Sequence, residues 1–406
     1  MQQYSFCISK EVLGTEKHLL CRKGSYSWVD EPPGYAWLLS REGSFHVDFC
    51  LNTLARLNDI ELKVEPPQRF VTAMQTVMSG SNAYPPPWQH VMPVDTHKGF
   101  VRDLIKQVVE TLDNSSQEYY RTIWVPGNRV LRSLKKAKIN AIKYAAAIES
   151  GEGNVSALKS FKPQAGGYAG VITYNRFGSR TGRITIDTGP SILTLKKEHR
   201  NIIESRYGSK GKIVIVDFAN LEPRVLLYEA GKRCDDPDLY TVLNNELFHG
   251  EGDRKIVKGA VISELYGISR FTLQKNLEQP LEVIDEFTKR IRAHFETGKL
   301  LKRIKACFVK EGYILNRYGR RVRIDEPLNH ILVNSYAQST GVDIAMLGFE
   351  QIIERCEGRK ITPICLLVDA LILDVHENEM GFLKLIKSVK VPGYVQSFYF
   401  SQEYIE

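Results

Sequence analysis

Two aspartates each follow a short apolar run that predicts a buried strand. Ile213–Val216 runs into Asp217, and Leu366–Val368 runs into Asp369. Two carboxylates brought together by apolar strands are the ligands that a pair of divalent cations needs. The two aspartates are therefore candidates for a shared metal site.

A helix with one basic edge is predicted between these aspartates. Asp253 suits its N-cap, and Arg254, Lys258, Ile262 and Tyr266 recur at steps of four. Because each step turns the helix by roughly 400°, the four side chains lie along one face. Arg254 and Lys258 can grip phosphates, and Ile262 and Tyr266 offer an apolar wall to a base. Together with the metal-site candidates, this face indicates nucleotidyl transfer.

A strand, a short turn and a helix are predicted around Asp217. Asn220 can cap the helix, Pro223 fits its first turn and Gly231 ends it. Glu222 would then project near the same site as Asp217. Alternatively, Glu222 only interacts with the N-terminal end of the helix dipole.

The segment around Asp369 predicts a buried hairpin over residues 364–375. A carboxylate in so apolar a setting is costly, so a metal or cationic partner is expected. Residues 329–356 form a long helical pattern just before it, with Asn334 and Gln338 one turn apart on one face. In isolation, such amides are ordinary polar helix residues.

Composition narrows the class of protein. With 406 residues and 43% hydrophobic content the chain can bury a large core, and its formal net charge of +8 suits either a polyanionic partner or an ordinary basic protein. Its seven cysteines show no CxxC or Cys/His spacing, which indicates free thiols and no zinc site. No signal peptide or membrane-spanning run is recognisable. We expect a soluble, intracellular, cytoplasmic protein with no membrane partner.

The N-terminal third has weaker signals. Residues 1–95 are an N-terminal region of uncertain fold with a proline-rich stretch at 84–88, and residues 97–150 read mostly as helix. The run 133–148 is especially rich in helix formers. Glycines across 151–170 predict a hinge or boundary.

Five segments in order resemble the family A DNA polymerases, the DNA polymerase I type, over about residues 165–406. Each segment is weak alone, but their order and spacing are specific. They are Thr181-Gly182-Arg183, Asp217 to Arg224 (motif A), Arg254 to Gly267 (motif B), Asn334-x3-Gln338-x-Thr340-x2-Asp343, and Leu367 to Ala370 (motif C).

The resemblance implies roles for these residues. Asp217 and Asp369, with the backbone carbonyl of Phe218, would hold two Mg²⁺ ions, for which Mn²⁺ can substitute. Lys258 would be catalytic as a proton donor to the leaving group. The incoming dNTP would meet Arg254, Lys258, Ile262, Tyr266, Glu222 and Tyr240. Primer-template DNA would meet Arg183, Asn334, Gln338 and Tyr266, and Glu222 would also exclude ribonucleotides.

The implied fold class is α+β, a right-hand polymerase fold with an antiparallel palm sheet, helical fingers and a thumb. We expect residues 1–95 to be the small N-terminal region, 96–160 the thumb, 161–235 and 326–406 the two parts of the palm, and 236–325 the fingers. Neither a full proofreading domain nor a 5′ nuclease fits, so the expected enzyme is a compact viral or accessory polymerase. Its partners would include a separate exonuclease or a processivity protein.

Two residues of motif C depart from the family pattern, and two alternatives remain open. Motif C is usually His-Asp-Glu, and here it is Val368-Asp369-Ala370. A degenerate, non-catalytic polymerase fold that binds primer-template DNA therefore remains an alternative. A single-subunit RNA polymerase relative shares the motif B spacing, but Glu222 argues against it because a ribose needs a small residue there.

Overall fold

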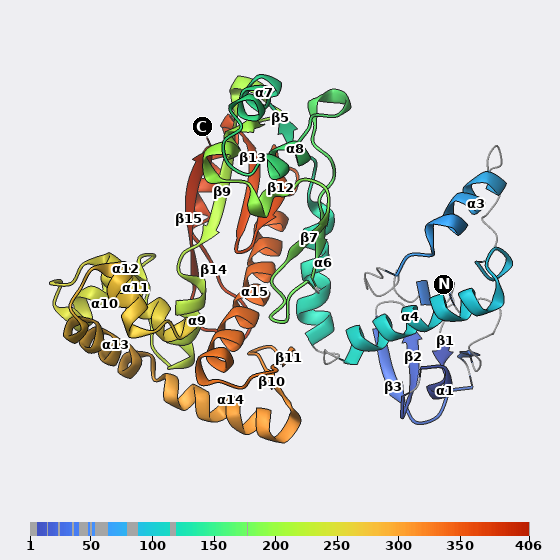
Figure 1. Cartoon of the computed structure of the whole chain (residues 1–406), viewed down its shortest axis with the longest axis horizontal. Helices are drawn as coiled ribbons and strands as arrows, with labels where there is room; N and C mark the ends of the chain where they lie inside the picture. The colour runs from blue at the N-terminus through green and yellow to red at the C-terminus, as the bar shows by residue number, and fades with distance from the viewer. Residues whose placement is uncertain are drawn as a thin grey trace. The chain divides into compact units, whose positions relative to one another are not determined.

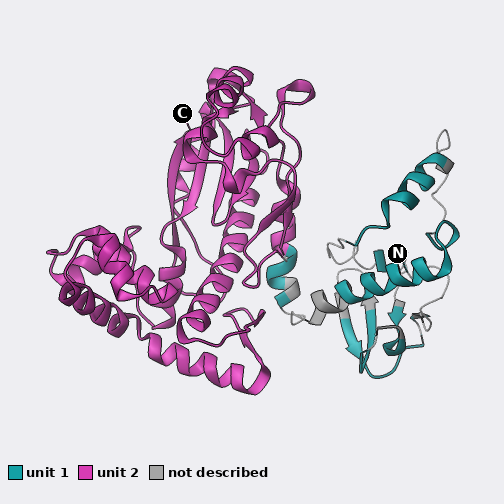
Figure 2. Cartoon of the chain, in the orientation of Figure 1, with its two compact units in different colours: residues 1–125 teal, residues 126–406 magenta. Residues whose placement is uncertain are grey.

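The computed structural model describes residues 6–13, 15–22, 25–34, 36–39, 48, 51–52, 64–78, 88–113, 119–176 and 178–405. The chain divides into two compact units, residues 1–125 and residues 126–406 (Figure 2). The division lies inside the range 96–160 that we expected to be the thumb, so this range contributes to both units. The mixture of helices and sheets confirms the α+β class.

The first unit contains a mixed sheet and several helices in its described residues. The strand order is β3-β2-β1-β4, with β1 antiparallel to β2 and parallel to β4. The elements are β1 (Phe6–Ile8), α1 (Lys10–Leu13), β2 (His18–Arg22), β3 (Ser25–Val29), β4 (Trp37–Leu39), α3 (Gln68–Met78) and α4 (Val94–Asp113).

The second unit is built on a five-stranded antiparallel sheet. Its order is β12 (Ile361–Leu367), β13 (Ala370–His376), β9 (Gly211–Phe218), β15 (Phe398–Ile405) and β14 (Ser388–Val389). The predicted hairpin is confirmed, because Leu367 pairs with Ala370 and leaves Val368 and Asp369 as a two-residue turn. Residues 213–216 of β9 are buried on both sheet faces, which explains why this strand is continuously apolar.

Helix α15 (Asn329–Cys356) has the bounds predicted from the sequence. It runs beside the sheet and packs against α9 (Leu221–Glu229) (Figure 1). The ring of Phe349 lies 5.6 Å from that of Phe218 on β9. Gly348 permits this approach, because a Cβ atom there would come within 2.5 Å of the Phe218 ring. Close packing thus couples α15 to the strand that ends at Asp217.

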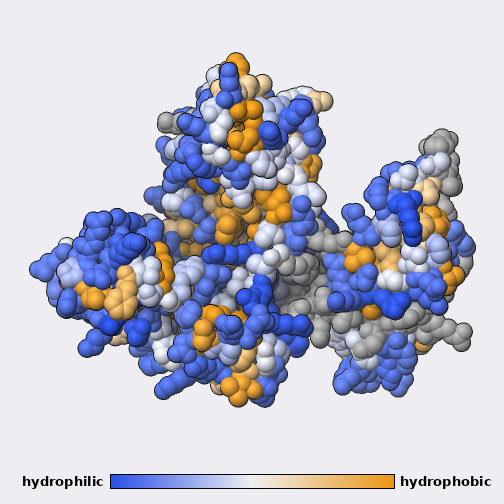
Figure 3. Space-filling view, in the orientation of Figure 1, coloured by the Kyte–Doolittle hydropathy of each residue, from blue (hydrophilic) through white to orange (hydrophobic). Residues whose placement is uncertain are grey.

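A helical segment lies between β9 and α15 in the chain. It comprises α10 (Leu239–Phe248), α11 (Arg254–Tyr266), α12 (Arg270–Leu277), α13 (Leu281–Phe295), α14 (Thr297–Glu311) and the hairpin β10 (Tyr313–Leu315) and β11 (Arg321–Arg323). The predicted N-cap is confirmed, since Asp253 accepts from the Lys255 N–H at 2.6 Å. Gly267 ends α11 in the left-handed conformation. The visible face of α10 to α13 is largely hydrophilic (Figure 3).

The predicted helix over 133–148 is partly wrong. Helix α6 (Val125–Ser133) ends there, and β5 (Lys138–Ile139) pairs with β8 (Ile203–Glu204) before α7 (Ala141–Ser150) begins. Asn140 starts α7 by accepting from the N–H groups of Ile142 and Lys143. Strand pairing with a distant segment and a local cap therefore override helix propensity here.

The remaining elements are short. They are α8 (Val155–Ser160), β6 (Thr173–Asn175), β7 (Thr185–Thr188), α16 (Met380–Leu385), the 3₁₀ turns Trp88–His90, Ala165–Gly167, Ile192–Thr194, Lys197–Ile202, Gly208–Lys210 and Glu377–Glu379, and the π-helical turn Tyr120–Trp124. Among the described residues, no helix is both long and apolar enough to cross a membrane.

Candidate active site

The sheet brings Asp217 and Asp369 to the same end of neighbouring strands. Asp217 is the penultimate residue of β9, and its direct partner on β13 is Ala370. The Phe218 N–H donates a hydrogen bond to the backbone carbonyl of Asp369 at 3.2 Å. The two aspartates are thus held by backbone pairing, as the sequence pattern predicted.

Both carboxylates are electrostatically unfavourable in their ionised forms. Burial, and after it the neighbouring charges of Asp369 and Glu403, raise the pKa of Asp217 to about 7. Burial also raises the pKa of Asp369, with a smaller effect from Glu222. A divalent cation would reverse this penalty, because an opposite charge favours the ionised form.

The donor set suits a site that a substrate completes. Among the described residues, no group of three or more His, Cys, Asp or Glu side chains could hold a metal ion. Asp217, Asp369 and the Phe218 carbonyl, which the sequence resemblance implies as ligands, would be the protein donors. Mg²⁺ keeps several waters and is usually bound by one or two carboxylates together with substrate phosphates. The residues present therefore fit Mg²⁺ in the presence of a phosphate substrate.

Glu222 joins two other predicted residues, Arg183 and Tyr266, in one cluster. Its carboxylate accepts hydrogen bonds from Arg183 Nη2 at 2.6 Å and from the hydroxyl of Tyr266. Burial and then this carboxylate raise the pKa of Tyr266 to about 12, so the phenol keeps its proton. Glu222 is therefore tied to a side chain of α11 and to one of the loop before β7, and does more than interact with its own helix.

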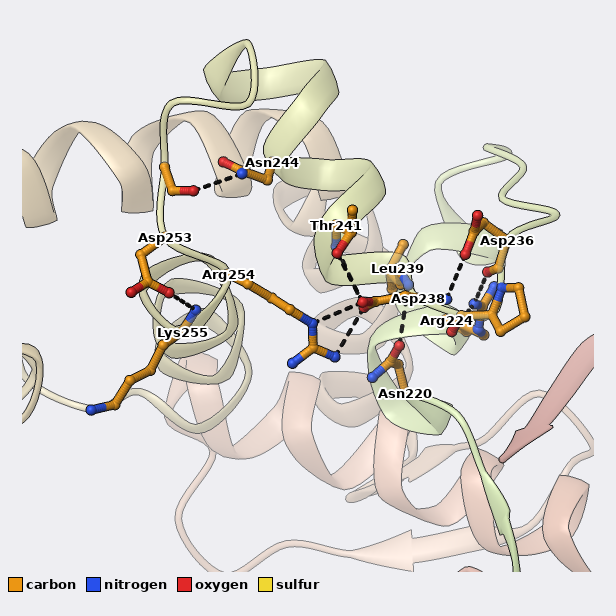
Figure 4. Close-up of polar contacts among 12 residues, drawn as sticks. Asn220, Arg224, Asp236, Asp238, Leu239, Thr241, Asn244, Asp253, Arg254 and Lys255 are labelled. Atoms are coloured by element: carbon orange, nitrogen blue, oxygen red, sulfur yellow. Dashed lines mark hydrogen bonds and ion pairs between the residues drawn. The ribbon is translucent and has the colours of Figure 1, made fainter. Parts of the chain in front are cut away.

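Asn220 occupies the predicted cap position but does not cap with its side chain. Its backbone adopts φ 56°, and its Oδ1 accepts from the Leu239 N–H at 3.3 Å, at the start of α10 (Figure 4). The amide thus links α9 to α10. A left-handed asparagine is tolerated because its short polar side chain finds a nearby partner.

The predicted face of α11 is present, with different environments along it. The Arg254 guanidinium pairs with Asp238, whereas Lys258 is exposed and makes no ion pair among the described residues. Ile262 and Tyr266 are half-buried further along the helix. The adjoining side of the helix, with Val257, Ala260, Val261 and Leu265, is buried.

Tyr240 lies in a more buried position than its predicted contact with a triphosphate suggests. The side chain is 4% exposed, and burial raises its pKa to about 12. Its ring lies 5.5 Å from the Arg254 guanidinium carbon. Tyr240 therefore contacts a predicted phosphate-binding side chain through its ring.

The two amide side chains on α15, Asn334 and Gln338, differ in whether their oxygen accepts a hydrogen bond. Gln338 accepts from the Thr181 hydroxyl at 3.2 Å, which joins α15 to the Thr181-Gly182-Arg183 segment. The Oδ1 of Asn334 is buried and has no hydrogen-bond partner among the described residues. An unsatisfied buried acceptor costs about 1–3 kcal/mol, so it indicates a place where a ligand could donate.

Three residues near the site escaped sequence reasoning. Arg200 opposes the rise in the Asp217 pKa, Arg320 donates to the Thr181 carbonyl at 3.1 Å, and Asp238 pairs with Arg254. Only Asp238 had a local signal, because aspartate is a preferred residue at a helix N-cap. The other two depend on long-range contacts.

Comparison with known proteins shows a similarity of fold and no similarity of sequence family. No protein-family model matches the chain, and no curated protein sequence matches it. Among solved structures with a similar fold is the POL domain of Pol1 from M. smegmatis, in complex with DNA primer-template and dNTP. The two share a TM-score of 0.56 and 14% sequence identity over 82% of this chain and 77% of that chain. The chain therefore has a polymerase-like fold.

Proposed function

We propose that this protein is a DNA-directed DNA polymerase of the family A type, which extends a primer 3′-hydroxyl with dNTPs. One observation carries the proposal: Asp217 and Asp369 share one end of a sheet, with raised pKa values, in a polymerase-like fold. Carboxylates in this state suit a two-metal nucleotidyl transfer.

The proposed layout follows the described elements. The five-stranded sheet and α15 belong to the proposed palm, residues 161–235 and 326–406, and α10 to α14 with the β10–β11 hairpin belong to the proposed fingers, residues 236–325. We keep residues 96–160 as the proposed thumb. A separate exonuclease or processivity protein is proposed as a partner.

In the reaction, the primer 3′-oxygen bonds to the α-phosphorus of the dNTP and the bond to the β-phosphate oxygen breaks. Asp217, Asp369 and the Phe218 carbonyl would hold two Mg²⁺ ions. When bound, such ions lower the pKa of the attacking hydroxyl and neutralise charge on the phosphates. Arg254 binds the triphosphate, and Lys258 gives a proton to the departing pyrophosphate.

Selection of the sugar and the primer end falls to the cluster around Glu222. The carboxylate is fixed by Arg183 and Tyr266, so it can crowd the 2′ position of a bound nucleotide. Asn334 presents an unsatisfied acceptor and, with Gln338 and Arg183, contacts the minor-groove side of the primer-template end. Tyr266 lies by the templating base.

Primer extension tests the proposal directly. The intact protein, a primed DNA template, dNTPs and Mg²⁺ should give extension that chelation abolishes. Asp217→Asn and Asp369→Asn keep the side-chain size but remove a metal-binding charge, so each should lower the rate at least 1000-fold, an order of magnitude typical for lost metal catalysis. Asp30→Asn is a matched control, because Asp30 forms an exposed ion pair in the first unit.

The non-catalytic alternative predicts a different outcome. Val368 and Ala370 keep it open, because the polar neighbours usual in the family are missing. If the intact protein binds primer-template DNA but does not extend it with Mg²⁺ or Mn²⁺, this alternative replaces the polymerase. Extension with NTPs in preference to dNTPs would instead support the RNA polymerase reading.

A further inference from the structure

The carboxylate of Asp238 is fully engaged by four hydrogen bonds. Oδ2 accepts from Arg254 Nε and from the Thr241 hydroxyl, both at 2.8 Å. Oδ1 accepts from Arg254 Nη2 at 3.0 Å and from the Thr241 N–H at 3.4 Å. Asp238 is thus both the N-cap of α10 and a bidentate partner of α11 (Figure 4). Its hydrogen bonds to Thr241 hold the carboxylate on its own helix, and its hydrogen bonds to Arg254 link it to α11.

The contact uses only one edge of the Arg254 guanidinium. Nε and Nη2 donate to Asp238, and Nη1 donates no hydrogen bond to any of the described residues. A guanidinium has five N–H donors in a fixed plane, so it can serve one anion at the Nε edge and another at the Nη end. The Tyr240 ring, 5.5 Å from the guanidinium carbon, restricts the plane further.

The arginine would otherwise be poorly ordered. Its side chain is 53% exposed, and an exposed ion pair adds little to folding stability. An arginine held in one orientation, however, binds an anion without the entropy loss of immobilising several side-chain bonds. The value of this contact therefore lies in orientation.

We propose that Asp238 is a positioning residue for nucleotide binding, which presents the Nη end of Arg254 to the triphosphate. This inference rests on the proposed function and adds a residue to it. Burial alone would raise the Asp238 pKa, but the hydrogen bond from Arg254 lowers it, so the carboxylate stays ionised near neutral pH. The opposing possibility is that Asp238 competes with the triphosphate for Arg254.

Asp238→Asn separates these two roles. Asparagine remains a good N-cap, so α10 is retained, while the charge that fixes Arg254 is lost. The matched control is Asp235→Asn, three residues before Asp238 in the chain. It removes the same charge from an exposed ion pair with Arg233. We expect the KM for dNTP to rise about 10-fold in Asp238→Asn, with a smaller change in kcat and none in the control.

A double variant tests whether the effect passes through Arg254. In an Arg254→Ala background, Asp238→Asn should have no further effect on KM. A fall in KM for Asp238→Asn would overturn the proposal in favour of competition. An effect equal to that of Asp235→Asn, or one that persists fully without Arg254, would also overturn it.

A direct binding measurement distinguishes failure of this inference from failure of the proposed function. If the intact protein extends no primer, the polymerase proposal fails, and titration calorimetry with dATP and Mg²⁺ then decides the role of Asp238. Weaker dATP binding by Asp238→Asn than by Asp235→Asn supports positioning. Equal binding by the two variants, or no binding by the intact protein, refutes it.

Discussion

Ala370 lies directly opposite Asp217 in the antiparallel register of β13 and β9. Directly paired residues project from the same sheet face, so the side chain after Asp369 shares a face with Asp217. In the family that this sequence resembles, that position is usually glutamate. The methyl group of Ala370 therefore leaves the candidate metal site with fewer oxygen donors.

Ala370→Glu should strengthen Mg²⁺ binding. A third carboxylate beside Asp217 adds an oxygen ligand and a charge, so the Mg²⁺ concentration for half-maximal primer extension should fall several-fold. Titration of the extension rate with Mg²⁺ measures this. Ala370→Gln has the same size without the charge and should not share the gain. A higher Mg²⁺ requirement in Ala370→Glu would show that position 370 is not near the metals.

Val368→Gly should stabilise the protein. Val368 has φ 51° in the two-residue turn between β12 and β13, a conformation that a β-branched residue adopts at a cost. Glycine removes that cost but adds entropy to the unfolded chain, so the net gain should be about 1 kcal/mol. Urea unfolding measures it. Val368→Ala, which keeps a Cβ atom, should gain less, and an equal gain would place the cause outside the turn.

Stability without metal should depend on pH through Asp217. Its folded pKa is about 7 against about 3.9 when unfolded. The protonated form is therefore favoured by folding, and its stabilising contribution is complete below about pH 4 and lost as pH rises through about 7. In EDTA, the Tm of the intact protein should fall relative to that of Asp217→Asn as the pH rises from about 4 to above about 7. Mg²⁺ added together with dATP at pH 8 should reverse the fall only in the intact protein, and parallel pH profiles would contradict this.

Glu222→Ala should relax sugar discrimination. The carboxylate is held by Arg183 and Tyr266, so its removal opens space that a 2′-hydroxyl could occupy. The ratio of dNTP to NTP incorporation should fall about 10-fold or more. Glu222→Gln keeps the volume and should keep most of the discrimination if the block is steric. An unchanged ratio in Glu222→Ala would remove this residue from the selection of the sugar.

Local signals were sufficient for several elements. Asp253 and Gly267 mark the start and the end of α11. The uninterrupted helical pattern predicts α15 at 329–356, and the apolar hairpin pattern predicts the turn that contains Asp369. Caps, periodicity and turn lengths act over a few residues, so the sequence alone reveals them. The face carrying Arg254 and Lys258 follows from helical spacing in the same way.

Contacts between distant segments needed the tertiary structure. Helix propensity favoured 133–148, yet Ile139 pairs with Ile203. Tyr240 had the chemistry of an exposed donor, yet packing buries it under Arg254. Burial and strand pairing depend on residues far apart in the chain, which no local pattern records.

The sequence by itself determined the order and spacing of the chemical groups: two strand-borne aspartates, a basic helix face and paired amides. Only the tertiary structure decided that β9 lies between β13 and β15, which places Ala370 opposite Asp217. The same packing buries the Asp217 carboxylate and raises its pKa. It alone paired Glu222 with Tyr266 and Asp238 with Arg254. The reason is physical: residue types specify which bonds are possible, whereas distance, orientation and desolvation, which follow from packing, determine the bonds that form.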